Sequence, residues 1–224
     1  IFIMSIYDVR IKTPFSLILA GASGCGKTTW LESFIKHFRI LTDGGTRYEK
    51  LLWFSGTKQP DLFQRVKSTF KGTIRFFDSI DSEIYSKIEK EGKKAIVVID
   101  DLMHEMGNMS DVGKLFTKGR SHLDCNVILL WQNVFPKGSE IRNLSTNAQH
   151  IVVFKNPRDK SQIRYFAQQV APGKIRQFLS VFEDATSIKY GYLHCDFSQD
   201  IPEKARFRTR IFPFEQPMIA YNII

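Results

Sequence analysis

Cysteine is scarce in this chain, and a long uninterrupted apolar run is missing. Cys25, Cys125 and Cys195 are odd in number and far apart in the sequence. Such spacing favours neither a disulfide framework nor a zinc site, so we expect a reducing compartment. No apolar run approaches the ~20 residues of a membrane-spanning helix, and residues 1–4 lack the design of a signal peptide. We therefore expect no stable insertion into a membrane.

Acidic residues are too few to balance the basic ones. The chain has 32 lysines and arginines against 23 aspartates and glutamates, a formal net charge of +9. This imbalance favours a polyanionic partner such as nucleic acid, although charge alone does not show binding. With 224 residues, no repeat and no clear linker, we expect a single domain over residues 1–224. Its core is predicted at about 14–186 and a C-terminal β extension at about 187–224.

One glycine-rich stretch is distinctive, because residues 21–28 fit G-x-x-x-x-G-K-[ST] at every fixed position. An apolar strand is predicted before it at 17–19, and a helix with one apolar face follows it. Glycines let such a loop curl so that its backbone N–H groups point at a phosphate chain, beside the positive end of the helix. A chance glycine turn is the alternative, which the flanking strand and helix disfavour.

The pattern assigns roles to individual residues of this loop. Lys27 would reach the β- and γ-phosphates, and the Thr28 hydroxyl would bind Mg²⁺. The predicted ATP-phosphate site comprises Gly21, Ala22, Ser23, Gly24, Cys25, Gly26, Lys27, Thr28 and Thr29.

Strands and helices are predicted to alternate along the chain. The expected strands lie at 51–54, 74–77, 95–101, 126–132 and 151–154, and the expected helices at 60–70, 82–91, 111–118 and on both sides of a break at 171–173. Asn156 and Pro157 suit the start of the helix before that break. This order predicts an α/β fold with a mainly parallel central sheet and helices on both faces. Segments 190–197 and 204–212 are predicted as a closing antiparallel pair.

Polar residues follow two of the buried strands. Asp100 ends an apolar β-branched run and would hold Mg²⁺, while Asp101 is the candidate for polarising the attacking water, with Glu105 in reserve. Gln132 ends the next buried strand, where a polar residue can touch the γ-phosphate or the water, and Asn133 is the second choice. A capped strand end and an ordinary loop amide are the alternatives.

Arg120 lies before that same strand and is a candidate to act across a subunit interface. An arginine delivered in this way can neutralise charge that develops on the γ-phosphate. Arg142 and Arg158 are alternatives, and a merely solvated arginine is the ordinary explanation in a basic chain.

A row of cations marks the end of the chain. If 204–212 is a strand, its period of two puts Lys204, Arg206, Arg208 and Arg210 on one face. Such a row would suit the phosphate backbone of nucleic acid. A solvated outer face that discourages edge aggregation is the alternative.

Several of these stretches together resemble a known family. They are residues 14–28, the acid pair Asp100–Asp101, residues 119–122 with 131–133, and residues 154–159, in this order. They resemble the genome-packaging ATPases of double-stranded DNA viruses of the poxvirus, adenovirus-like and virophage type, within the FtsK/HerA superfamily. The form carried by Polinton/Maverick elements is the most similar. The resemblance covers roughly residues 14–197, most of the chain.

The resemblance implies a RecA-like ASCE P-loop fold and ATP hydrolysis with Mg²⁺. It implies a homo-oligomeric ring, a pentamer or a hexamer, that translocates double-stranded DNA into a preformed capsid together with capsid or packaging-vertex proteins. It also implies action at virus assembly sites in the host nucleus or cytoplasm, or in the virion. The position of Gln132 is then a phosphate sensor, and Arg120 fits the trans-acting arginine of FtsK-like motors. One departure is Asp101, where many ASCE enzymes have Glu.

Three other functions compete with a packaging translocase. A helicase or DNA-mobilisation ATPase would use the same phosphate loop. A small-molecule or nucleoside kinase would need an arginine-rich lid and an acceptor pocket. A non-hydrolysing scaffold is disfavoured by the intact set of Lys27, Thr28 and Asp100.

Overall fold

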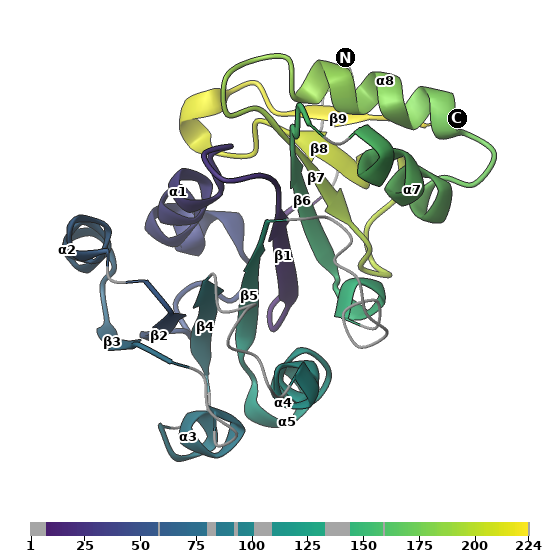
Figure 1. The fold of residues 1–224 in the computed structure, drawn as a ribbon. Coiled ribbons are helices and arrows are strands. Elements are labelled where there is room, and N and C mark those ends of the chain that lie inside the picture. The colour runs from purple at the N-terminus through teal and green to yellow at the C-terminus, as the bar shows by residue number, and fades with distance from the viewer. Residues whose placement is uncertain are drawn as a thin grey trace.

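One twisted sheet runs through the molecule (Figure 1). The computed structural model describes residues 8–57, 59–79, 84–91, 94–100, 109–132, 144–158 and 160–223. Within these residues the sheet has nine strands in the order β3-β2-β4-β5-β1-β6-β7-β8-β9. The strands are β1 (Ser16–Ala20), β2 (Lys50–Ser55), β3 (Thr73–Phe77), β4 (Ala95–Asp100), β5 (Asn126–Trp131), β6 (His150–Phe154), β7 (Tyr192–Asp196), β8 (Phe207–Thr209) and β9 (Ile219–Tyr221).

The type of strand pairing changes once across the sheet, from parallel to antiparallel at β6. From β3 to β6 every neighbouring pair is parallel, whereas β6–β7, β7–β8 and β8–β9 are antiparallel. The predicted α/β class, with a mainly parallel sheet and an antiparallel C-terminal extension, is confirmed.

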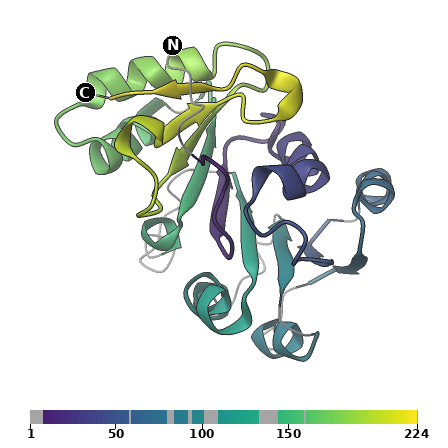
Figure 2. The same ribbon diagram turned by 180° about the vertical axis from the view of Figure 1, so that it is seen from behind.

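Helices cover both faces of this sheet, as Figures 1 and 2 show from opposite sides. On one face pack α1 (Lys27–Leu41) and α2 (Pro60–Thr69). On the other pack α3 (Ile84–Glu91), α4 (Met109–Lys114), α7 (Lys160–Val170) and α8 (Ile175–Ala185). A π-helical turn at Leu115–Gly119 connects α4 to the short α5 (Arg120–Leu123). Within the described residues, no helix is both long and apolar enough to cross a bilayer.

The continuous apolar runs follow from burial of the strands on both faces. Along β4 every residue is buried, with Ile96 and Val98 in the core under α1 and α2 and Val97 and Ile99 in the opposite core. Side chains of a strand alternate between faces, so a strand covered on both sides needs apolar residues at every position.

The order of the strands decides which ends meet. β5 lies between β1 and β4, so an extra strand separates the strand before the phosphate loop from the strand that ends in Asp100. This is the arrangement implied by the ASCE resemblance. Because β1, β4 and β5 are parallel, their carboxyl ends lie along one edge, where Gly21 N–H donates to the Trp131 carbonyl at 3.1 Å.

The chain's end departs from the sequence prediction. The predicted strand at 204–212 shrinks to β8, because Glu203–Ala205 forms a 3-10 turn and Arg210 has a left-handed φ of 55°. A further strand, β9, was not predicted. Upstream of α7, Asn156 Oδ1 accepts from the Arg158 N–H at 3.1 Å, while the helix itself is described from Lys160.

Candidate functional site

A cavity of about 370 Å³ opens at the carboxyl edge of β1, β4 and β5. Its walls come from five segments of the chain, and residues of the glycine-rich loop form one side. The lining residues are Ser23, Gly24, Gly26, Lys27, Thr28, Thr29, Gln59, Asp100, Leu130, Gln132 and Tyr190. The structure therefore brings Lys27, Thr28, Asp100 and Gln132 together from three separate stretches of sequence.

The glycine-rich loop depends on backbone angles that favour glycine. Gly24 has φ 75° and Gly26 has φ 109°, both in the left-handed region. Gly26 caps α1, whose first turn carries no acidic residue. The positive end of this helix therefore faces the cavity, and no carboxylate in the first turn neutralises it. Such an end favours the binding of an anion.

Lys27 folds back over its own loop. Its Nζ donates to the Gly21 carbonyl at 2.5 Å and to the Ala22 carbonyl at 3.0 Å. Phosphate oxygens entering the cavity would compete with these carbonyls for the ammonium group. Cys25 lies 4.0 Å from the same nitrogen, and burial raises the pKa of its thiol despite the neighbouring charge of Lys27. Cys25 is therefore an uncharged thiol that does not neutralise the neighbouring ammonium group.

Asp100 lines the cavity from the end of β4. It ends β4 with only 5% of its surface exposed, and Gln59 Nε2 donates to its Oδ2 at 3.3 Å. Magnesium prefers oxygen ligands and commonly takes one or two protein oxygens plus substrate phosphates. Asp100, Thr28 and Lys27 line one cavity, so the set of donors available there, a carboxylate, a hydroxyl and an ammonium group, fits a Mg²⁺-nucleotide.

Some predicted residues fall outside the described part of the chain. Asp101, its reserve Glu105, and Asn133 lie there, as does Arg142. Their proposed roles remain predictions.

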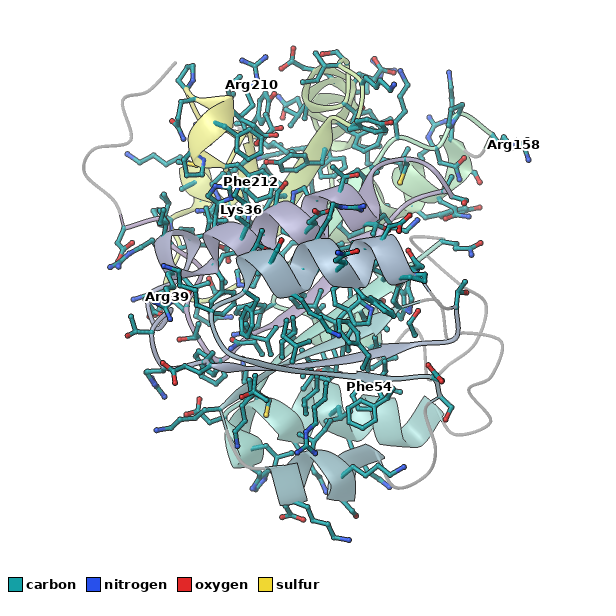
Figure 3. The ribbon with its side chains drawn as sticks, turned by 90° about the vertical axis from the view of Figure 1, so that its left-hand side faces the viewer. Lys36, Arg39, Phe54, Arg158, Arg210 and Phe212 are labelled. Atoms are coloured by element: carbon teal, nitrogen blue, oxygen red, sulfur yellow. The ribbon has the colours of Figure 1, made fainter. Side chains whose placement is uncertain are left out.

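Arg120 does not line the cavity. It begins α5, and β5 then runs from Asn126 to Trp131 before reaching Gln132. Arg120 thus lies near the amino end of β5, a strand length of roughly 20 Å from the cavity edge. The alternative, Arg158, is exposed and lies at the right-hand edge of the view in Figure 3.

The predicted row of four cations does not form. Lys204 lies in the 3-10 turn and Arg206 pairs with Glu203. Arg208 is 1% exposed, and its guanidinium donates to Asp196 Oδ2 at 2.6 Å and to the Val9 carbonyl at 2.8 Å.

The prediction of a basic strand face is therefore wrong, for a physical reason. β8 packs into the sheet between β7 and β9, and the buried face carries Arg208. Its charge is compensated inside the protein, so it is not available to a phosphate backbone. Arg210, which itself has the left-handed φ, is half-buried and is labelled in Figure 3.

Besides Leu130 of β5, two lining residues were missed from the sequence. Gln59 follows β2, the neighbour of β4, and Tyr190 lies in the loop between α8 and β7. Neither belongs to a contiguous motif. Gln59 could have been predicted from its place shortly after a predicted strand. No sequence signal pointed to Tyr190.

Comparison with known proteins identifies the fold of this chain and its family. The genome packaging NTPase B204 from Sulfolobus turreted icosahedral virus 2, solved in complex with sulfate, is 12% identical, with a TM-score of 0.55 over 97% of this chain and 98% of that one. The cytoplasmic domain of EssC is 18% identical, with a TM-score of 0.50 over 71% of this chain and 34% of that one. At these identities the likeness concerns the fold, a RecA-like P-loop architecture. No curated protein matches the sequence.

A family model matches most of the chain. The Poxvirus A32 protein model covers residues 6–190, a span that holds the glycine-rich loop, Asp100, Gln132 and Tyr190. The chain therefore belongs to the Poxvirus A32 protein family.

Proposed function

We propose that this protein is an ATPase that couples ATP hydrolysis to translocation of double-stranded DNA during genome packaging. The observation that carries the proposal is the convergence of Lys27, Thr28, Asp100 and Gln132 on one cavity. The family, and the fold shared with the packaging NTPase B204, support the same function.

Each residue of the cavity has a task in this proposal. The loop N–H groups and Lys27 bind the β- and γ-phosphates, and Thr28 and Asp100 hold Mg²⁺. The metal, when bound, neutralises charge on the phosphate oxygens. Gln132 contacts the γ-phosphate or the attacking water. Asp101 is the proposed residue that polarises this water.

The remaining proposals concern partners. The net charge of +9 suits a polyanion such as DNA. The position of Arg120, away from its own cavity, suits a homo-oligomeric ring in which a neighbour receives it. Capsid or packaging-vertex proteins are the further partners, and virus assembly sites are the proposed location.

ATPase measurements with and without long double-stranded DNA test the proposal. Lys27→Ala should abolish tight nucleotide binding or turnover, because the loop has no second phosphate-facing cation. Asp100→Asn should retain part of the nucleotide binding and lose Mg²⁺-dependent hydrolysis. Lys36→Ala is the control, since Lys36 is an exposed lysine of the same helix outside the cavity.

The outcomes separate the competing functions. A packaging translocase is stimulated by long duplexes, a helicase by single strands or forks, and a kinase needs its small acceptor. Hydrolysis at the normal rate in Asp100→Asn would contradict the metal-holding role of this residue.

A further inference from the structure

Tyr190 has an unusual backbone for a tyrosine. Its φ is 62°, in the left-handed region that residues other than glycine, asparagine and aspartate seldom adopt. The next residue, Gly191, packs so tightly that a Cβ there would lie 2.7 Å from the Ala185 carbonyl oxygen. The loop between α8 and β7 thus turns sharply at this point.

The ring lies directly against the phosphate loop. A Cβ built on Gly26 would come within 3.0 Å of Tyr190 Cδ1 and 3.1 Å of its Cβ. Gly26 immediately precedes Lys27, and Tyr190 lines the same cavity as Lys27, Thr28 and Thr29. Even so, half of the Tyr190 surface, 50%, is exposed.

A cation accompanies the ring. The Lys189 ammonium lies 5.0 Å from the Tyr190 ring centroid, in the range of a cation–π contact. An aromatic ring that is half exposed, flanked by a cation and fixed beside a phosphate-binding loop offers a flat surface for another flat group. A nucleotide with its phosphates in this loop carries such a group in its base.

We propose that the Tyr190 ring is the surface on which the base of the bound nucleotide stacks. This inference rests on the proposed function, because it takes the glycine-rich loop as the phosphate site. Stacking uses the π-face that every base has, so it tolerates different bases. The ring therefore adds affinity for a nucleoside triphosphate over bare triphosphate, with little choice between ATP and GTP.

Calorimetric titration of ATP, GTP and inorganic tripolyphosphate against matched variants tests this. Tyr190→Asn removes the ring and suits the left-handed backbone, because asparagine is enriched there. ATP and GTP should bind roughly 5- to 150-fold more weakly, from the usual worth of stacking one base on an aromatic ring. Tripolyphosphate should bind as before, and Tyr190→Phe should retain wild-type affinity for all three. Tyr165→Asn, which removes a 64% exposed tyrosine of α7 outside the cavity, is the control.

Three results would overturn the stacking surface alone. They are unchanged ATP affinity in Tyr190→Asn, an equal loss for ATP and tripolyphosphate, and a loss in Tyr190→Phe as large as in Tyr190→Asn. An equal loss for ATP and tripolyphosphate would mean that the ring supports the loop through its contact with Gly26. A loss in Tyr190→Phe would mean that the tyrosine hydroxyl, and not the ring face, contacts the nucleotide. A wild-type protein that binds neither ATP nor tripolyphosphate would instead overturn the proposed phosphate site itself.

Discussion

Two cations that were both predicted to meet phosphate have opposite surroundings. Lys27 lines an open cavity, and its Nζ donates to the Gly21 and Ala22 carbonyls of its own loop. Arg208 is 1% exposed and is paired with Asp196. The first cation can exchange its partners for a ligand. The second has its charge compensated within the fold, so its contribution is to structure.

The surroundings of Arg208 form a buried polar cluster on three adjacent strands. His150 of β6, His194 and Asp196 of β7 and Arg208 of β8 are all within 2% of complete burial. His194 Nε2 lies 3.2 Å from His150 Nδ1, and Ser198 donates to Asp196 Oδ1. Burial alone would raise the pKa of Asp196, but electrostatic interactions with His150, His194 and Arg208 lower it to about 2. Asp196 is therefore an anion that holds Arg208 in place.

Arg120 is a third case beside Lys27 and Arg208, because it lies neither in the cavity nor in the buried cluster. If it acts in trans, Arg120→Ala should leave the nucleotide affinity of a monomer nearly unchanged. Hydrolysis by the assembled ring should fall by roughly 10³- to 10⁵-fold, since the guanidinium stabilises the transition state more than the bound ground state. ATPase rates and nucleotide titrations of the same preparations measure both.

A mixing experiment separates trans action from general damage. Rings of Arg120→Ala subunits mixed with Lys27→Ala subunits should regain part of the activity, because some interfaces pair a sound cavity with a sound arginine. Absence of recovery despite demonstrated co-assembly would count against Arg120, and Arg142 would be tested next.

Arg208→Met tests whether the buried cation serves stability. We expect a loss of about 3–5 kcal/mol in the free energy of unfolding, because the change leaves the Asp196 charge buried and unpaired. Arg10→Met is the matched control: Arg10 pairs with Asp8 at 2.7 Å, but both side chains are about half exposed. The urea midpoint of Arg10→Met should stay close to that of the wild type. Equal midpoints for the two variants would contradict the structural role of Arg208.

Gln59→Ala tests whether the cavity needs a supporting amide. Gln59 donates to Asp100, and loss of a group that orients a metal ligand typically costs roughly 10- to 100-fold in metal affinity or activity. A Mg²⁺ titration of the ATPase should show this loss, while Gln64→Ala, an exposed glutamine of α2, should behave as the wild type. Unaltered Mg²⁺ dependence and turnover would remove Gln59 from the site.

The buried histidines predict acid sensitivity. Burial, only partly opposed by Asp196, lowers the pKa of His150 to about 4, and burial lowers the pKa of His194 well below its usual value. Histidines of the unfolded chain have a pKa near 6.5, so below this pH they bind protons that the buried histidines of the folded protein do not bind. The free energy of unfolding therefore falls as the pH drops from about 6.5 toward 4.

Urea unfolding at two pH values measures this. From pH 7.0 to pH 6.0 the loss should be on the order of 1 kcal/mol. His150→Asn should reduce the pH dependence of the free energy of unfolding. His37→Gln, which changes a half-buried histidine of α1, should leave this pH dependence intact. A wild-type midpoint that does not move between the two pH values would show that the cluster accepts protons without cost.

Contiguous patterns in the sequence predicted more than isolated residues did. The strand ending in Asp100 was expected from its β-branched run, which is buried at all six positions. The fixed spacing of residues 21–28 predicted the loop that lines the cavity. The cation spacing at 204–210 failed, because period two is meaningful only if the whole segment is a strand.

The sequence by itself determined what neighbouring residues do to one another. Glycines set the loop's angles, and the run of apolar residues in β4 required cover on both faces, since each follows from the local backbone and side chains. The tertiary structure decided the partners that lie far apart in the chain. Gln59 meets Asp100 across 41 positions, and Arg208 meets the Val9 carbonyl across 199. Such contacts depend on which strands become neighbours in the sheet, and the packing of the whole core fixes that order.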